Sequence, residues 1–80
     1  MTLRLSADNK VVGVKQVQKA LDSDEIEILF FAKDADKEVT ADIVNTCIQK
    51  DIEVVEVETM EELGEACKID INAAIAALLK

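Results

Sequence analysis

The sequence predicts an α/β fold: a three-layer α-β-α sandwich built on a small mixed four-stranded sheet. Short runs of β-branched and apolar residues alternate with amphipathic helical patterns along the chain, which is typical of this fold class. One run, Ile26 to Ala32, is almost continuously apolar, so its strand should be central, with helices on both sides. A chain of 80 residues has room for one core, and we expect residues 1–80 to form a single domain.

The N-terminal elements follow in order. Leu3 to Asn9 is predicted to be a short helix or a frayed end. Lys10 to Val12 is predicted to be a short strand. Val14 to Asp22 has apolar residues at helical spacing and is predicted to be an amphipathic helix. A polar loop over residues 33–37 follows the central strand.

A second amphipathic helix then runs to about Lys50, and its N-cap is either Asp36 or Thr40. Ile52 to Val57 is predicted to be a β-branched strand. Thr59 to Glu62 has the pattern of a capping box and predicts the start of a third helix. Local propensity makes residues 73–79 a helix, whereas tertiary context would make them a strand.

The corner at Gly13 is the most informative segment. Glycine lets a ligand approach the backbone closely, and the start of the following helix offers free N–H groups suited to a phosphate. Lys15 adds a positive charge, Gln16 adds a donor and an acceptor, and Lys19 lies on the same helical face as Lys15. The alternative is an ordinary strand–turn–helix corner with a solvated polar face.

Composition excludes several classes of protein. Phe30 and Phe31 are the only aromatic residues, so aromatic base-stacking platforms are absent. The chain has no His, and Cys47 and Cys67 form no Cys-x-x-Cys pair, which predicts buried free thiols and no zinc site. Without His, an activated Cys arrangement or a phosphate-cradling glycine loop, we expect neither an enzyme nor a cofactor.

The longest apolar run is too short to span a bilayer, and no secretory signal is visible, so we expect a cytoplasmic protein. The net charge of −8 argues against nonspecific binding of nucleic acids. The charge is uneven, because residues 1–20 hold four basic residues and one acidic residue, whereas residues 21–80 hold five basic and sixteen acidic ones. Positive charge therefore gathers around the Gly13 corner.

Five motifs follow one another along the chain: Gly13-Val14-Lys15-Gln16, Lys19-Ala20-Leu21, Ala32-Lys33-Asp34-Ala35-Asp36, Leu63-Gly64-Glu65-Ala66-Cys67 and Ile69-Asp70-Ile71 with Ala73-Ala74. Together they resemble the kink-turn RNA-binding ribosomal-protein family of the L-seven-Ae type, and in particular its bacterial YbxF-like branch. The family pattern at the first corner is Gly-Thr-(Asn/Lys)-(Glu/Gln), from which Val14 departs. The Pro that usually follows the Asp-Ala-Asp segment is replaced by Lys37.

The resemblance implies a protein that binds kink-turn RNA, in rRNA, a riboswitch or another structured RNA. We expect a monomer that binds neither DNA nor membranes, and the sequence itself leaves the oligomeric state open. It implies that Gly13, Lys15 and Gln16 meet sheared G·A pairs and that Lys19 meets the RNA backbone. Lys33 matches a lysine of the bacterial branch. The loop Ile69-Asp70-Ile71 matches the segment that covers an extruded nucleotide, as suits recognition of distorted RNA.

Three alternatives remain open on sequence grounds. The two isoleucines of the 69–71 loop could be core anchors. Asp34, Asp36 and Glu38 could be cation ligands, although they lack the glycine of an EF-hand loop. The carboxylates between Glu53 and Glu65 are expected to form a solvated face, but they could also make the chain an acidic protein-interaction module.

Overall fold

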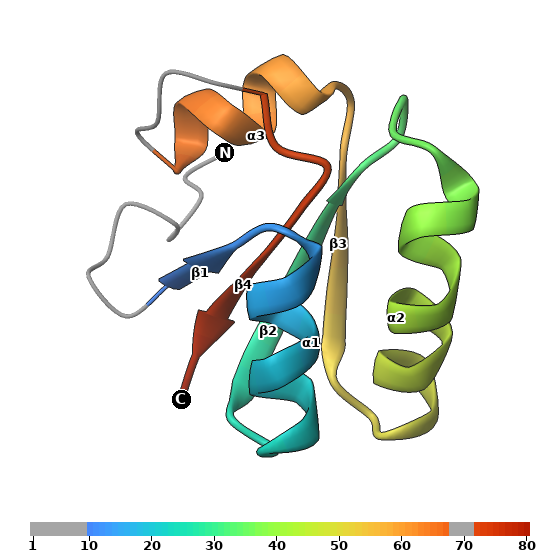
Figure 1. The fold of residues 1–80 in the computed structure, drawn as a ribbon, viewed down its shortest axis with the longest axis vertical. Coiled ribbons are helices and arrows are strands. Elements are labelled where there is room, and N and C mark those ends of the chain that lie inside the picture. The colour runs from blue at the N-terminus through green and yellow to red at the C-terminus, as the bar shows by residue number, and fades with distance from the viewer. Residues whose placement is uncertain (1–9, 68–71) are drawn as a thin grey trace.

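The computed structural model describes residues 10–67 and 72–80, and the expectation for Leu3 to Asn9 lies outside them. Strands and helices alternate from β1 to β4, as the sequence predicts (Figure 1). The elements are β1 (Lys10–Val12), α1 (Val14–Asp22), β2 (Ile26–Ala32), α2 (Lys37–Gln49), β3 (Glu53–Val57), α3 (Met60–Ala66) and β4 (Ile75–Leu79).

The four strands form one mixed sheet in the order β1-β4-β2-β3. β4 pairs antiparallel with both β1 and β2, whereas β2 and β3 pair in parallel. Helices α1 and α2 lie side by side on one face of the sheet, and α3 packs on the other (Figure 1). The predicted three-layer sandwich is therefore confirmed.

β2 occupies a central position, as its apolar composition predicts. Its register with β4 shifts between Ile26 and Ile28, so the alternation of side chains changes at this point. Ile26 and Leu29 pack with α1 and α2, whereas Ile28 and Phe30 pack with α3. The irregularity therefore places Ile26 on the face that α1 and α2 cover, whereas regular alternation would place it on the same face as Ile28.

The last apolar run forms a strand, which decides between the two expectations for residues 73–79. Ala76 and Ala77 are fully buried on opposite faces of the sheet. Helix propensity favours alanine, but β4 fills the space between β1 and β2, and both neighbours supply hydrogen-bond partners for its backbone. Tertiary context overrides local propensity here.

Side-chain hydrogen bonds identify the N-cap residues of α2 and α3. Asp36 is the N-cap of α2 and accepts a hydrogen bond from the Glu38 N–H at 2.9 Å, while Thr40 is buried inside the helix. Thr59 is the N-cap of α3, and its hydroxyl accepts a hydrogen bond from the Glu62 N–H at 3.0 Å, as the capping-box pattern predicts.

Among the helices that the structure describes, none is long and apolar enough to cross a membrane.

Candidate RNA-binding surface

The Gly13 corner connects β1 to α1 and lies against the start of β4. The Gly13 N–H donates to the Ile75 carbonyl at 3.0 Å, and the Gly13 carbonyl accepts from the Val17 N–H at 2.9 Å. Gly13 has φ 98° and ψ 153°, a conformation that is almost exclusive to glycine. A Cβ atom would meet no atom within 4 Å, so the backbone conformation, and not crowding, requires glycine here.

The N-terminus of α1 is open. No side chain caps it, and its first turn carries no acidic residue. The N–H groups of Val14, Lys15 and Gln16 make no hydrogen bond to another residue that the structure describes. These donors and the positive end of the helix dipole are therefore available to an anion.

The side chains around this helix start carry uncompensated positive charge. Lys15, Gln16 and Lys19 are exposed, and so is Lys33 at the end of β2. Within residues 10–67 and 72–80, none of the three lysines forms an ion pair, although the chain has 17 carboxylate side chains. Val14 is also exposed, at 37%, so an apolar side chain stands beside these polar groups.

Gln16 and Lys19 also border a shallow, open pocket of about 300 Å³ between α1, β1 and the end of β4. Apolar side chains and polar groups share its lining. Its residues are Val11, Gln16, Lys19, Ala20, Ser23, Glu25 and Leu79.

Backbone hydrogen bonds bring Lys33 to the same end of the sheet as the Gly13 corner. The Ala32 N–H donates to the Ala74 carbonyl at 2.9 Å, and Ala74 immediately precedes Ile75, the partner of Gly13. The first corner and the turn after β2 are therefore held by consecutive residues at the start of β4. The structure thus brings together Gly13, Val14, Lys15 and Gln16 at the corner, with Lys19 one turn further along α1 and Lys33 across β4.

The remaining predicted contacts, Ile69, Asp70 and Ile71, lie outside the described residues. Their neighbour Ala73 is described, and its N–H donates to the Met60 carbonyl at 3.1 Å.

The alternative of a cation site in the turn after β2 is not supported. Asp34 accepts a hydrogen bond from the Met60 N–H at 2.8 Å, whereas Asp36 caps its own helix. No group of three His, Cys, Asp or Glu residues in the described part of the chain is arranged to hold a metal ion. The contact of Asp34 with α3 had no local signal in the sequence, because its partner lies 26 positions away.

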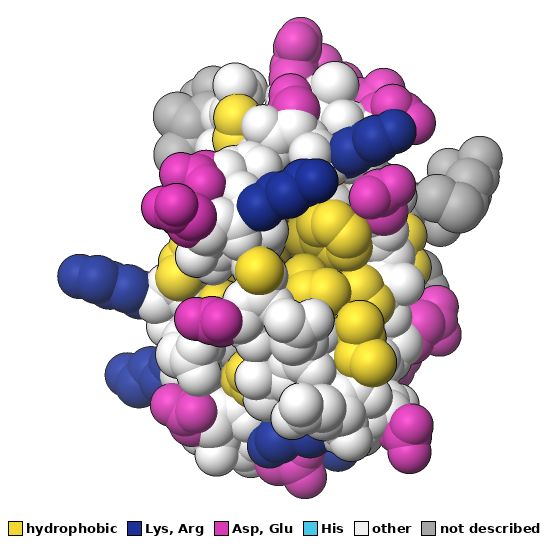
Figure 2. Space-filling model, turned by 90° about the vertical axis from the view of Figure 1, so that its right-hand side faces the viewer, with side chains coloured by type: hydrophobic (Ala, Val, Ile, Leu, Met, Phe, Trp, Pro, Cys, Tyr) yellow, Lys and Arg dark blue, Asp and Glu magenta, His cyan; other side chains and the backbone are white. Residues whose placement is uncertain are grey.

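The glutamates from Glu53 to Glu65 lie on β3, on α3 and in the connection between them. The glutamates of β3 and α3 are all exposed, which confirms the expected solvated face. Figure 2, which faces the right-hand side of Figure 1, shows acidic side chains spread around a hydrophobic patch. The glutamates of β3 are Glu53 and Glu56, those of α3 are Glu61, Glu62 and Glu65, and Glu58 is exposed in the connection between the two elements.

The two cysteines are free and buried, as expected, one in each core cluster. Burial raises the pKa of both thiols, and the nearby positive charges of Lys50 and Lys10 only partly oppose this shift for Cys47 and Cys67 respectively. Both thiols are therefore protonated at neutral pH and unreactive as nucleophiles.

Comparisons with known proteins agree with this arrangement. Residues 2–80 match the model of the ribosomal protein L7Ae/L30e/S12e/Gadd45 family. An RNA-binding protein of Caldanaerobacter subterraneus is 43% identical over 68 residues, which cover 85% of this chain and 83% of that protein. The RNA-binding protein YbxF of Geobacillus stearothermophilus is 34% identical over 76 residues, which cover 95% of this chain and 93% of that protein.

Solved structures share the fold. A 15.5 kD RNA binding protein of Giardia lamblia superposes with a TM-score of 0.85 at 23% identity, over 95% of this chain and 64% of that protein. A Bacillus halodurans protein of unknown function superposes with a TM-score of 0.83 at 20% identity, over 99% of this chain and 79% of that one. The match to the family model and the bacterial relatives together show that this chain belongs to the ribosomal protein L7Ae/L30e/S12e/Gadd45 family.

Proposed function

We propose that this protein binds RNA and recognises kink-turn motifs through the surface formed by the Gly13 corner, α1 and the turn after β2. The observation that carries the proposal is the open, uncapped N-terminus of α1, flanked by exposed Lys15, Gln16 and Lys19. Bacterial relatives that cover most of the chain are named RNA-binding proteins, which supports the same conclusion.

The chemistry of this surface suits a distorted duplex. A regular RNA helix hides its base edges in a deep and narrow groove, whereas sheared pairs and bulges expose them. Lys15 and Gln16 can form hydrogen bonds with exposed base edges, and free backbone N–H groups at a helix start can donate hydrogen bonds to a phosphate. Lys19 and Lys33 add positive charge that can attract phosphates of the RNA backbone on either side of these base contacts.

The overall charge restricts how RNA can approach. Net charge is −8, so phosphates gain attraction only near the lysines of this surface and are repelled by the glutamates of β3 and α3. We therefore expect modest affinity, a strong dependence on salt and a single orientation of the bound RNA.

The test is a titration of the protein with a kink-turn duplex and with a straight duplex of matched length and composition, in low salt. We expect tighter binding to the kink-turn duplex, and the difference should persist as salt is raised because it arises from base contacts. Equal affinity for the two duplexes would contradict kink-turn recognition but leave general RNA binding intact. Failure to bind either duplex would contradict both.

A further inference from the structure

The turn after β2 holds the backbone of Lys33 between two neighbouring segments. The Lys33 N–H donates to the carbonyl of Val57, the last residue of β3, at 2.7 Å. On the other side, the Ala32 N–H donates to the Ala74 carbonyl at 2.9 Å. The turn closes on itself through a 3.1 Å hydrogen bond from the Ala35 N–H to the Ala32 carbonyl. The Lys33 side chain is nevertheless exposed.

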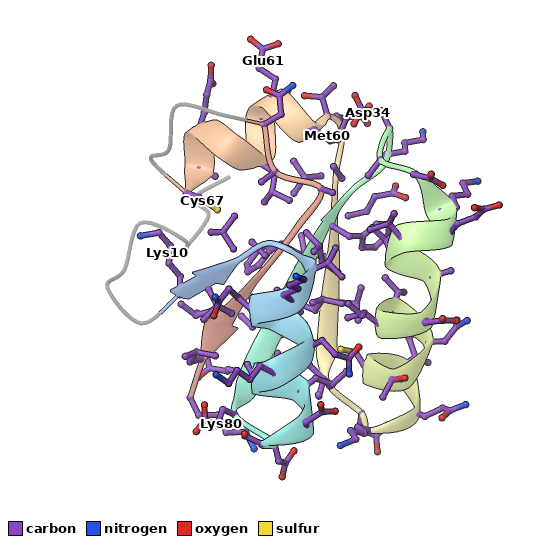
Figure 3. The ribbon with its side chains drawn as sticks, in the orientation of Figure 1. Lys10, Asp34, Met60, Glu61, Cys67 and Lys80 are labelled. Atoms are coloured by element: carbon purple, nitrogen blue, oxygen red, sulfur yellow. The ribbon has the colours of Figure 1, made fainter. Side chains whose placement is uncertain are left out.

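The Asp34 side chain adds a contact to this turn. Its Oδ1 accepts a hydrogen bond at 2.8 Å from the N–H of Met60, the first residue of α3. Figure 3 shows the two residues close together at the end of the molecule where α3 begins. Val57 and Met60 lie at the two ends of the connection between β3 and α3. Residues 33 and 34 are therefore hydrogen-bonded to both ends of this connection. The Met60 carbonyl in turn accepts from the Ala73 N–H, which ties the same point to the approach to β4.

A carboxylate at this position has an electrostatic cost for RNA binding. Asp34 is exposed and directly follows Lys33, so it repels the same phosphates that Lys33 attracts. Asp36, two residues later, has the same charge but accepts its hydrogen bond from Glu38 within its own helix. The contact with α3 distinguishes Asp34 from Asp36 and indicates a structural reason for a carboxylate beside Lys33.

We propose that Asp34 is a positioning residue for Lys33. By binding the Met60 N–H, its carboxylate fixes the turn so that the Lys33 ammonium group is presented to the RNA backbone from a rigid support. Fixing the backbone in advance lowers the conformational entropy that Lys33 loses on binding. This inference rests on the proposed RNA-binding function and adds to it a residue that makes no contact with RNA itself.

The first test compares three variants in binding to a kink-turn duplex, under conditions in which circular dichroism shows each to be folded. Asp34→Ala should weaken binding about fivefold, the equivalent of one lost helix-cap interaction. Asp34→Asn keeps an acceptor oxygen and removes the repulsive charge, so it should bind at least as tightly as the wild type. Asp36→Ala is the control for losing a capping carboxylate in the same loop, and it should not weaken binding.

The second test is a double-mutant cycle with Lys33→Ala. Lys33→Ala should reduce the slope of log affinity against log salt by about one, the loss of one phosphate contact. Asp34→Ala should reduce the slope in the same direction and should cause no further loss of affinity in the Lys33→Ala background. A role in global stability alone would change neither the slope nor this coupling.

The outcomes separate the inference from the proposed function. Equal gains in affinity for Asp34→Ala and Asp36→Ala would show that Asp34 acts only through its charge and would overturn the inference. Additive effects of Asp34→Ala and Lys33→Ala would also overturn it. A wild-type protein that binds neither duplex would overturn the proposed function and this inference together, whereas binding by the wild type with unchanged affinity for Asp34→Ala would overturn the inference alone.

Discussion

Helices α1 and α3 begin in opposite ways. The first turn of α1 has no side-chain cap and no acidic residue, and its N–H groups have no partner among the described residues. In contrast, two N–H groups at the start of α3 have side-chain acceptors. The Glu62 N–H donates to the hydroxyl of Thr59, and the Met60 N–H donates to the carboxylate of Asp34. Its first turn also carries Glu61 and Glu62, which lie at the favourable end of the helix dipole.

At the start of α3 the chain itself supplies acceptors for the backbone N–H groups, whereas at the start of α1 the N–H groups remain available to a ligand. A capped helix start is more stable, and α3, with seven residues, needs that support because short helices are marginal on their own. An open helix start is less stable but attracts anions. Our proposal is that the uncapped start of α1 serves binding, and the contrast between the two helix starts can be tested by substitution.

Gly13→Ala should have the largest effect, since it disturbs both folding and binding. Alanine at φ 98° forces a conformation that costs roughly 1–3 kcal/mol, which should appear as a lower midpoint in urea unfolding. The same change should weaken binding to kink-turn RNA, because relaxation of the corner would displace the start of α1. An unchanged unfolding midpoint would show that the corner tolerates a side chain.

Lys15→Ala should weaken binding to a kink-turn duplex by about 1–3 kcal/mol if Lys15 contacts a base edge, while the unfolding free energy stays nearly constant. The matched control is Lys37→Ala, because Lys37 also lies in the first turn of a helix and is exposed. The control should change affinity only slightly. Equal losses for the two variants would indicate nonspecific attraction and would remove the assignment of Lys15 to a base contact.

Thr59→Ala removes the hydroxyl cap of α3 and should lower the unfolding free energy by about 1 kcal/mol, measured by urea denaturation. The affinity of the folded protein for RNA should fall much less than in Lys15→Ala, because the Thr59 hydroxyl binds the Glu62 N–H and not the Met60 N–H that holds Asp34. A comparable loss of RNA affinity would show that the two helix starts do not act separately.

Lys15→Glu should have opposite effects on stability and binding. A carboxylate in the first turn of α1 should raise the unfolding free energy by roughly 0.3–1 kcal/mol through the helix dipole, and this gain should shrink in high salt. Binding to RNA should fall further than in Lys15→Ala, since the new charge repels phosphate. A loss of stability would show that the start of α1 is not open to anions.

The sequence predicted what depends on local pattern. The apolar run from Ile26 to Ala32 predicted a central strand, and the spacing of Thr59 and Glu62 predicted the start of α3. The corner at Gly13 was identified because glycine followed a β-branched pair and preceded a helical pattern. In each case the determining residues are neighbours in the chain.

Features that depend on distant partners escaped prediction. The strand β4 resembles a helix in its own composition, and only the ladders of β1 and β2 make it extended. The role of Asp34 depends on an amide far along the chain, and the sequence suggested only a cation ligand as an alternative for this residue. Asp36 and Thr40 could not be separated as caps until the packing of α2 placed Thr40 in the interior.

The bond between Gly13 and Ile75 has a consequence for the order of events during synthesis. The Gly13 corner leaves the ribosome before Ile75, which supplies its hydrogen-bond acceptor, has been added. A contact between such distant residues is slow to form, because closing the intervening loop costs conformational entropy. A growing chain therefore cannot complete this surface, and a fragment that stops before Ile75 would not compete with the finished protein for its RNA.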